Sequence, residues 1–228
     1  MYRTRLITIL FILAVSNAFS QQHNRVKCDF SIKENLPDGT SNLTIGTVYF
    51  DKNHRKLVYN ISFPKKTFQV LTDSFFYEVS NNKLSEKKQA ANLLQFSIFN
   101  LALSSNLANY GLNTNGVFKL TDVSKEDSLV ISTWEPSTAK LKELTGKVLI
   151  SQKKRLLYGL VFFDNKDKIL SKQFFTDYKN INGLNFPTQI IQINYINGKE
   201  YYKVTTYKDI VVNATNENEI YNYNITAY

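Results

Sequence analysis

The stretch that decides the fold is 85–103, SEKKQAANLLQFSIFNLAL, because it has the pattern of a long helix in a chain otherwise typical of strands. Ser85 can cap such a helix, and Glu86 suits the positive end of its dipole. From Ala90 onward, apolar side chains cover more than one stripe of the helix. A helix of this kind is either buried in the core or covers a second apolar surface. The sequence therefore predicts a central helix, either as part of a core or as a plug or lid on a hydrophobic cavity.

The segments on both sides of this helix have the composition and alternation of β-strands. The chain contains Phe 16 and Tyr 14 but only Gly 8 and Pro 4, which is typical of strands. Within 56–63, apolar side chains recur with a period of two at Leu57, Tyr59, Ile61 and Phe63. The predicted strands are 27–33, 42–51, 56–63, 67–72, 75–79, 118–123, 128–133, 146–151, 156–163, 169–178, 186–196 and 199–212.

The connections between these strands are short and polar, which makes neighbouring strands antiparallel. Asn197-Gly198 is a strong signal for a two-residue hairpin turn, and 136–144 has room for one or two helical turns. So many antiparallel strands in one sheet must curl. The strand 156–163 is apolar on both faces, which fits a curved sheet that holds the helix or an ordinary two-layer core. We therefore expect an α+β fold in a single domain, with no linker that would divide it.

The first twenty residues have the pattern of a signal peptide. Arg3 and Arg5 form a positive region, Leu6–Val15 an apolar run, and Ala18-Phe19-Ser20 a cleavage signal. The apolar run is shorter than the ~20 residues that a membrane-spanning helix needs. We therefore expect residues 1–20 to be removed after Ser20, leaving 21–228 as one exported domain, soluble or peripherally attached to a membrane.

Cys28 is the one cysteine of the chain. The residues before it, Arg25-Val26-Lys27, lack the leucine and small residues that precede an acylated cysteine, so we expect no lipid there. As a single cysteine it has no partner for an intramolecular disulfide. We expect it to be a small strand residue rather than a reactive thiol.

Charge and residue types argue against several classes of function. Loss of the first twenty residues lowers the formal net charge from +9 to +7, which is moderately basic, but no nucleic-acid module accompanies this charge. His23 and His54 are the only histidines, so a histidine-based metal site or catalytic triad has little to build on. The sequence predicts a protein that is not an enzyme, with no catalytic residues, metal, cofactor or bound nucleic acid.

Several short motifs, taken in order, resemble the LolA-type lipoprotein carrier superfamily. In the N-terminal half they are GTVYF (46–50), LVY (57–59), SFP (62–64) and FQVLTDSFFY (68–77). In the C-terminal half they are GKVL (146–149), the hairpin after Phe163, and Tyr178 followed by NGLNFP (182–187). The resemblance extends over residues 27–213, and the order of the motifs carries most of it.

This resemblance implies a curved, unclosed antiparallel β-barrel, a half-barrel whose helix covers an apolar cavity for acyl chains. It implies a periplasmic, non-enzymatic carrier of lipoprotein acyl chains or lipid, for transport to or sorting at the outer membrane. The expected partners are membrane-bound donor and acceptor proteins, and the expected state is a monomer. The alternative is an envelope protein-interaction or sensor module of the same fold with a filled core.

Strand alternation and helix spacing then assign the residues of the cavity. The expected lining is Tyr59, Ile61, Phe63, Phe68, Val70, Leu94, Ile98 and Leu101. A register error of one residue would turn the strand residues to the other face. Two features depart from the family: no helix precedes the first strand, and Val58 stands where the family has an arginine that holds the lid shut. We therefore expect a divergent relative without that latch.

Overall fold

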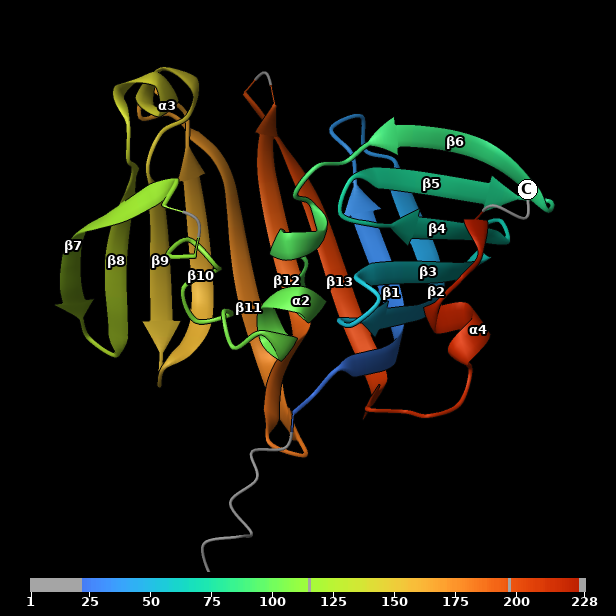
Figure 1. The fold of residues 1–228 in the computed structure, drawn as a ribbon. Helices are drawn as coiled ribbons and strands as arrows, with labels where there is room; N and C mark the ends of the chain where they lie inside the picture. Colours follow the sequence, from blue (N-terminus) through green and yellow to red (C-terminus); the bar gives the residue numbers. More distant parts are fainter. Residues whose placement is uncertain (1–21, 115, 197, 226–228) are drawn as a thin grey trace, which may run out of the picture.

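The computed structural model describes residues 22–114, 116–196 and 198–225. The predicted signal peptide and its cleavage site lie outside these residues. The described part of the chain forms one antiparallel sheet of thirteen strands (Figure 1). The strands are β1 (Arg25–Asn35), β2 (Ser41–Asp51), β3 (Lys56–Phe63), β4 (Thr67–Leu71), β5 (Phe75–Ser80), β6 (Lys83–Gln89), β7 (Phe118–Glu126), β8 (Leu129–Pro136), β9 (Val148–Lys153), β10 (Leu156–Phe163), β11 (Ile169–Ile181), β12 (Leu184–Ile196) and β13 (Lys199–Val212).

The order of the strands explains how one segment comes to cross the sheet. The chain starts in the middle at β1 and proceeds through neighbouring strands to β6 at one edge. It continues from β7 at the opposite edge and returns to β13, which pairs with β1. The connection from β6 to β7 therefore spans the whole sheet, and in Figure 1 it lies in front of it. The sheet is curved and does not close, so the predicted half-barrel with a helix is confirmed.

The central helix is shorter than predicted. A 3-10 turn, η1 (Leu94–Phe96), is followed by α2 (Ile98–Leu103), and the Ser97 hydroxyl accepts a hydrogen bond from Asn100 N at 3.2 Å as its N-cap. Ser85 and Glu86, predicted to start the helix, lie instead in β6. That prediction was wrong because Asn81-Asn82 forms a two-residue hairpin turn, with φ of 52° and 55°, that leads the chain back along β5.

The predicted strands and the helical segment in 136–144 are confirmed, whereas Asn197 of the predicted hairpin turn lies outside the described residues. All twelve predicted strands are present, and the segment 136–144 contains α3 (Ala139–Leu144), with the Thr138 hydroxyl as its N-cap. The short helix α4 (Asn218–Tyr221) was not predicted.

Apolar side chains form two separate clusters, one on each face of the sheet. We call the face that packs against α2 the inner face; its cluster includes Phe30, Val48 and Tyr207. The outer face carries a smaller cluster, in which Tyr49 and Val58 pack with Tyr221 of α4. The C-terminal segment thus covers part of the outer face, while the β6–β7 connection covers the inner one.

Asp51, the last residue of β2, is a buried carboxylate. It accepts hydrogen bonds from Arg25 Nε at 2.5 Å and from the backbone nitrogens of Asn53 and His54, and His54 Nδ1 lies 2.8 Å from it. Burial acts to raise the pKa of Asp51, but the hydrogen bonds from His54 and Arg25 outweigh it and hold the pKa below its ordinary value. The folded state therefore prefers the ionised carboxylate.

We expect Asp51→Asn to lower the free energy of unfolding by about 1.5–3 kcal/mol at pH 7. Because the folded pKa is depressed, this stabilisation is complete above the unfolded pKa of about 3.9 and is lost as the pH falls through the folded value. Urea unfolding of wild type and variant at pH 7 and at pH 3 tests this, with Trp134 fluorescence as the probe. The difference in the free energy of unfolding between wild type and variant should be smaller at pH 3 than at pH 7. An equal difference at the two pH values would contradict the prediction.

Candidate functional site

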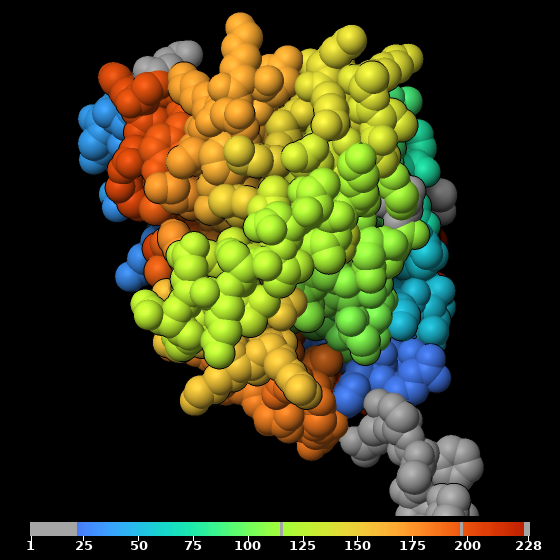
Figure 2. Space-filling view, turned by 90° about the vertical axis from the view of Figure 1, so that its left-hand side faces the viewer, coloured from blue at the N-terminus to red at the C-terminus, as the bar shows by residue number. Residues whose placement is uncertain are grey.

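The candidate site is the inner face of the sheet together with residues 90–114, which we call the crossing segment. This segment joins the two edge strands, so its ends are fixed while its middle lies on the inner face. Its buried side chains are almost all apolar: Ala90, Leu94, Ile98, Phe99, Leu101, Ala102, Leu103, Leu107 and Leu112. In Figure 2 the green atoms of the crossing segment lie between the yellow and orange atoms of the C-terminal half and the cyan and blue atoms of the N-terminal half.

Phe99 is the centre of this contact. Its side chain is fully buried, and its ring lies 5.5 Å from that of Phe186, 5.4 Å from that of Tyr207 and 6.3 Å from that of Phe50. These partners come from β2, β12 and β13. We call the part of the inner face that lies under the crossing segment the floor, and the pairing of β1 with β13 the seam. One side chain of α2 thus touches the floor on both sides of the seam. Ring pairs at these separations stabilise beyond the area that they bury.

Tyr110 makes a second contact farther along the crossing segment. Its ring stacks on Phe96 at 6.0 Å and meets Phe162 and Phe175 of the floor at 6.1 and 6.4 Å. Burial raises the pKa of Tyr110 to about 12, so the hydroxyl stays neutral at physiological pH. The crossing segment therefore packs on β10 and β11 as well as on the seam.

The polar contacts between the sheet and the crossing segment are weak by comparison. Lys52 Nζ donates to Leu103 O at 3.1 Å, and Gln152 Nε2 donates to Ala108 O at 2.8 Å. Both acceptors are main-chain carbonyls, which water can satisfy equally well when the segment moves away. Apolar packing is therefore the main force that holds the crossing segment down.

Five of the eight residues predicted to line a cavity belong to the inner cluster or pack against it. Leu94, Ile98 and Leu101 of the crossing segment are buried in one cluster with Ile61 of β3. Tyr59 packs against this cluster, with its ring 5.1 Å from that of Phe30. Phe63, at the end of β3, is 48% exposed and lies opposite Ile45, which in turn lies opposite Ser31, so the register places it on the other face of the sheet from Phe30.

Phe68 and Val70 lie on the outer face, so their assignment to the cavity was wrong. In the β3–β4 pair, Val70 lies opposite Val58 and Phe68 opposite Asn60, and residues opposite each other share a face. Gln69 and Leu71 of β4 lie on the inner face, opposite Tyr59 and Leu57. Because Gln69 is polar, the alternation of apolar residues in the sequence did not show that this side of β4 faces inward. Val58 is also in the outer cluster, so it does not face α2.

Sequence reasoning also missed most of the floor. The residues in question are Phe30, Phe50, Leu160, Phe175, Phe186 and Tyr207. The alternation of Val26, Cys28 and Phe30 in β1 was a usable signal, because the three share the inner face. The pairing of β1 with β13, which joins the two halves of the floor, had no local signal.

Two cavities adjoin the C-terminal end of α2. One has a volume of about 480 Å³ and the other about 210 Å³, and both are lined by Ala102, Ser105, Gly183 and Leu184. The β11–β12 turn, where Gly183 has φ of 87°, forms their outer wall. The inner face is thus filled under α2 but open to solvent at this end of it.

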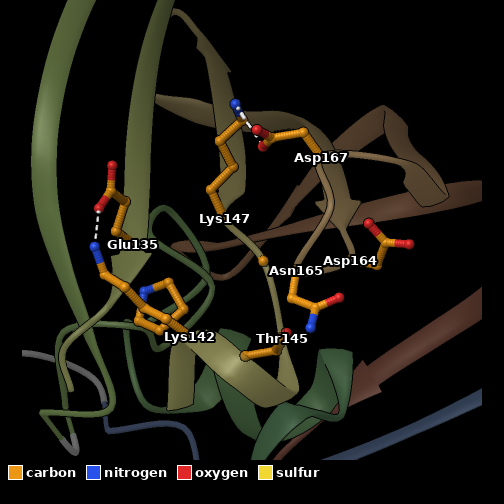
Figure 3. Close-up of a pocket in the computed structure, with 9 residues that line it drawn as sticks. Glu135, Lys142, Thr145, Lys147, Asp164, Asn165 and Asp167 are labelled. Atoms are coloured by element: carbon orange, nitrogen blue, oxygen red, sulfur yellow. Dashed lines mark hydrogen bonds and ion pairs between the residues drawn. The ribbon is translucent and has the colours of Figure 1, made fainter. Parts of the chain in front are cut away.

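A third pocket lies next to α3 and is lined mainly by charged side chains (Figure 3). Its volume is about 250 Å³; Lys142 pairs with Glu135 at 2.9 Å and Lys147 with Asp167 at 3.0 Å. Asp164 accepts hydrogen bonds from the backbone nitrogens of Lys168 and Lys166, which hold its pKa below the ordinary value. These carboxylates serve turn geometry and exposed ion pairs, which makes the pocket a poor candidate for acid–base chemistry.

The described residues contain no cluster of three or more His, Cys, Asp or Glu side chains placed to hold a metal ion. None of the helices in this part of the chain has both the length and the apolar character to span a membrane.

Comparison with known proteins relates this geometry to solved folds. The sequence matches no family model and no curated protein. Among solved structures, the chain is similar to a LolA superfamily protein from Nitrosomonas europaea, with a TM-score of 0.60, 14% identity, and coverage of 88% of this chain and 91% of that one. It is also similar to a DUF1329 family protein from Desulfovibrio piger (TM-score 0.59, 14% identity, 92% and 95% coverage).

A third similar structure is a domain assigned to outer membrane lipoprotein-sorting proteins, from Vibrio parahaemolyticus. Its TM-score is 0.62 at 12% identity, with coverage of 96% of this chain and 98% of that one. At these identities the likeness shows the fold. The chain has the LolA-type fold over nearly its whole described length, in a divergent sequence.

Proposed function

We propose that the protein is a non-enzymatic periplasmic carrier that binds the acyl chains of lipoproteins or lipids between the inner face and the crossing segment. Its role is transport to, or sorting at, the outer membrane, with membrane-bound donor and acceptor proteins as partners. The observation that carries this proposal is the apolar contact between the inner face and a segment that is covalently fixed at the two sheet edges. The assignment of one structural neighbour to lipoprotein sorting supports the same class of ligand.

The physical basis is an exchange of one apolar occupant for another. When the crossing segment leaves the floor, its leucines and Phe99 lose burial; an incoming acyl chain regains ~0.8 kcal/mol for each methylene that it buries. The net affinity is the difference between these two quantities. A carrier needs such a difference to be small, because it must release its cargo to an acceptor.

The binding test is native mass spectrometry of the gently purified mature protein, followed by titration with a fluorescent fatty acid and a diacylated lipopeptide. We expect a bound acyl species in the wild type that is lost in Ile61→Glu, which places a carboxylate in the floor. Ile45→Glu is the matched control, because Ile45 is already 40% exposed, and it should still bind. A correctly folded wild-type protein that binds neither probe would refute the carrier.

The alternative function is an envelope interaction or sensor module with a permanently filled core. The close packing of Phe99 on Phe186 and Tyr207 favours it, since no ligand is needed to complete this core. The two functions differ in whether the crossing segment opens while the sheet stays folded.

Cys28 reports on this opening. It is fully buried on the inner face, in the cluster covered by α2, and burial, helped by the nearby charge of Asp29, raises its pKa. In a carrier, thiol labelling proceeds through local opening, so its rate depends weakly on urea below the unfolding transition. In a filled core, labelling requires global unfolding, and its rate rises with the full urea dependence of that transition.

A further inference from the structure

The inner face is not covered over its whole width. At the β7–β8 edge, Leu120 is 49% exposed, Val123 54% and Val130 41%. We call these three residues the edge strip.

The strand register places the edge strip on the inner face. Leu120 lies opposite Trp134, which belongs to the inner cluster. Val123 lies opposite Ser132, which in turn lies opposite the buried Ile150 of β9. The edge strip is therefore a continuation of the floor.

Near Val130, the border of the covered region runs between β8 and β9. Val130 lies opposite Gln152 of β9, and Gln152 donates its hydrogen bond to Ala108 O of the crossing segment. The cover thus reaches Gln152, and the uncovered strip begins one strand farther out. The edge strip and the covered floor are neighbouring parts of one face of the sheet, which join directly through apolar side chains at Leu120 and Trp134.

An exposed apolar strip on an edge strand is unusual. Edge strands are commonly protected by charged side chains, and β7 carries Lys119, Asp122 and Glu126. Leu120 and Val123 lie on the inner side of the sheet, and Lys125, opposite Val130, lies on that side with them. Such a surface is costly in water unless something covers it for part of the time.

We infer that the edge strip is the loading surface of the carrier, on which an acyl chain lies before it replaces the crossing segment in the inner cluster, to which Trp134 and Ile150 belong. This inference rests on the proposed function and identifies where its ligand arrives. Three side chains offer far less than the ~800 Å² that a stable protein interface buries on each partner. A single acyl chain matches the narrow strip and its continuity with the floor.

The test compares the rates of acyl binding in matched variants. Leu120→Thr, Val123→Thr and Val130→Thr are combined, because threonine is β-branched and favours strands while it makes an exposed position polar. The control combines Leu170→Thr and Val211→Thr, two exposed apolar positions outside the strip, at 44% and 47%. Stopped-flow fluorescence with a monomeric fluorescent fatty acid gives both rate constants.

We expect the edge-strip variant to bind and to release the fatty acid about tenfold more slowly, with its Kd within twofold of wild type. A route that is used in both directions must slow both rates together, whereas the control should match wild type. Unchanged rates would overturn the inference, and so would a raised Kd with unchanged association, which would place the strip in the final site. A wild-type protein that never binds the probe refutes the proposed function itself. Unchanged rates with weakened self-association in sedimentation would mark the strip as a contact between copies.

Discussion

Phe99→Ala is expected to release the crossing segment from the floor while the sheet stays folded. Cys28 should then react with a thiol reagent about 10²- to 10³-fold faster than in wild type, in the absence of denaturant. The measurement is the labelling rate at neutral pH, followed by mass spectrometry of the intact protein.

The size of this effect follows from the packing of Phe99. Truncation of a fully buried phenylalanine typically costs about 3–5 kcal/mol, and each 1.4 kcal/mol is a factor of ten in an equilibrium constant. Phe99 is fully buried and contacts Phe50, Phe186 and Tyr207 across the seam, so most of this cost is paid in the closed state alone. The polar contacts from Lys52 and Gln152 remain, but each contributes only about 0.5–1.5 kcal/mol.

Phe174→Ala is the matched control. Phe174 pairs with Tyr158, at a ring distance of 6.2 Å, and lies opposite Ile191 rather than in the inner cluster. Its truncation should lower global stability without changing the labelling of Cys28 in the absence of urea. If Phe99→Ala instead lowers the unfolding midpoint and leaves native-state labelling of Cys28 unchanged, α2 is part of a filled core. The crossing segment then does not open as the carrier proposal requires.

The sequence was sufficient for those parts of the fold that depend on local patterns. The alternation of Leu57, Tyr59 and Ile61 correctly gave the inner face of β3, and the apolar run after Ala90 correctly gave an element in contact with that face. Both signals arise from burial on one side, which leaves a period in the sequence. The same reasoning correctly placed Leu94, Ile98 and Leu101 together.

The errors share one physical cause, which is that strand phase and pairing are set by partners distant in the sequence. β4 is too short for its own alternation to fix its face, so Phe68 and Val70 were assigned to the wrong side. β6 is rich in charge and has almost no apolar period, because it is an exposed edge, and it was read as the start of a helix. The β1–β13 seam, which joins the two halves of the floor, is a pairing of the first strand with the last.

The second large effect concerns the C-terminal segment, which the periodicity of the sequence also did not predict. Tyr221 of α4 is fully buried on the outer face, with its ring 5.3 Å from that of Tyr49 and the Arg25 guanidinium 4.8 Å from its centre. Just before α4, Glu217 accepts a hydrogen bond from Lys27 Nζ at 2.6 Å. The C-terminal segment thus contacts both β1 and β2, the first two strands of the chain.

We expect Tyr221→Ala to lower the free energy of unfolding by about 3–5 kcal/mol, as for other large buried rings. Tyr221→Phe should be as stable as wild type or up to about 1 kcal/mol more stable, since the hydroxyl of Tyr221 has no hydrogen-bond partner among the described residues. Urea unfolding of the three proteins measures both differences. A phenylalanine variant as unstable as the alanine variant would show that the hydroxyl, not the ring, makes the decisive contact.

The same pair of variants separates the two faces of the sheet. Tyr221 belongs to the outer cluster, whereas the proposed ligand contacts the inner one, and the sheet lies between them. Fatty-acid affinity in Tyr221→Ala should therefore stay within about twofold of wild type under conditions where the variant is folded. A large loss of affinity would mean that the C-terminal segment and the floor are coupled through β2 and β3, and that stability on one face controls binding on the other.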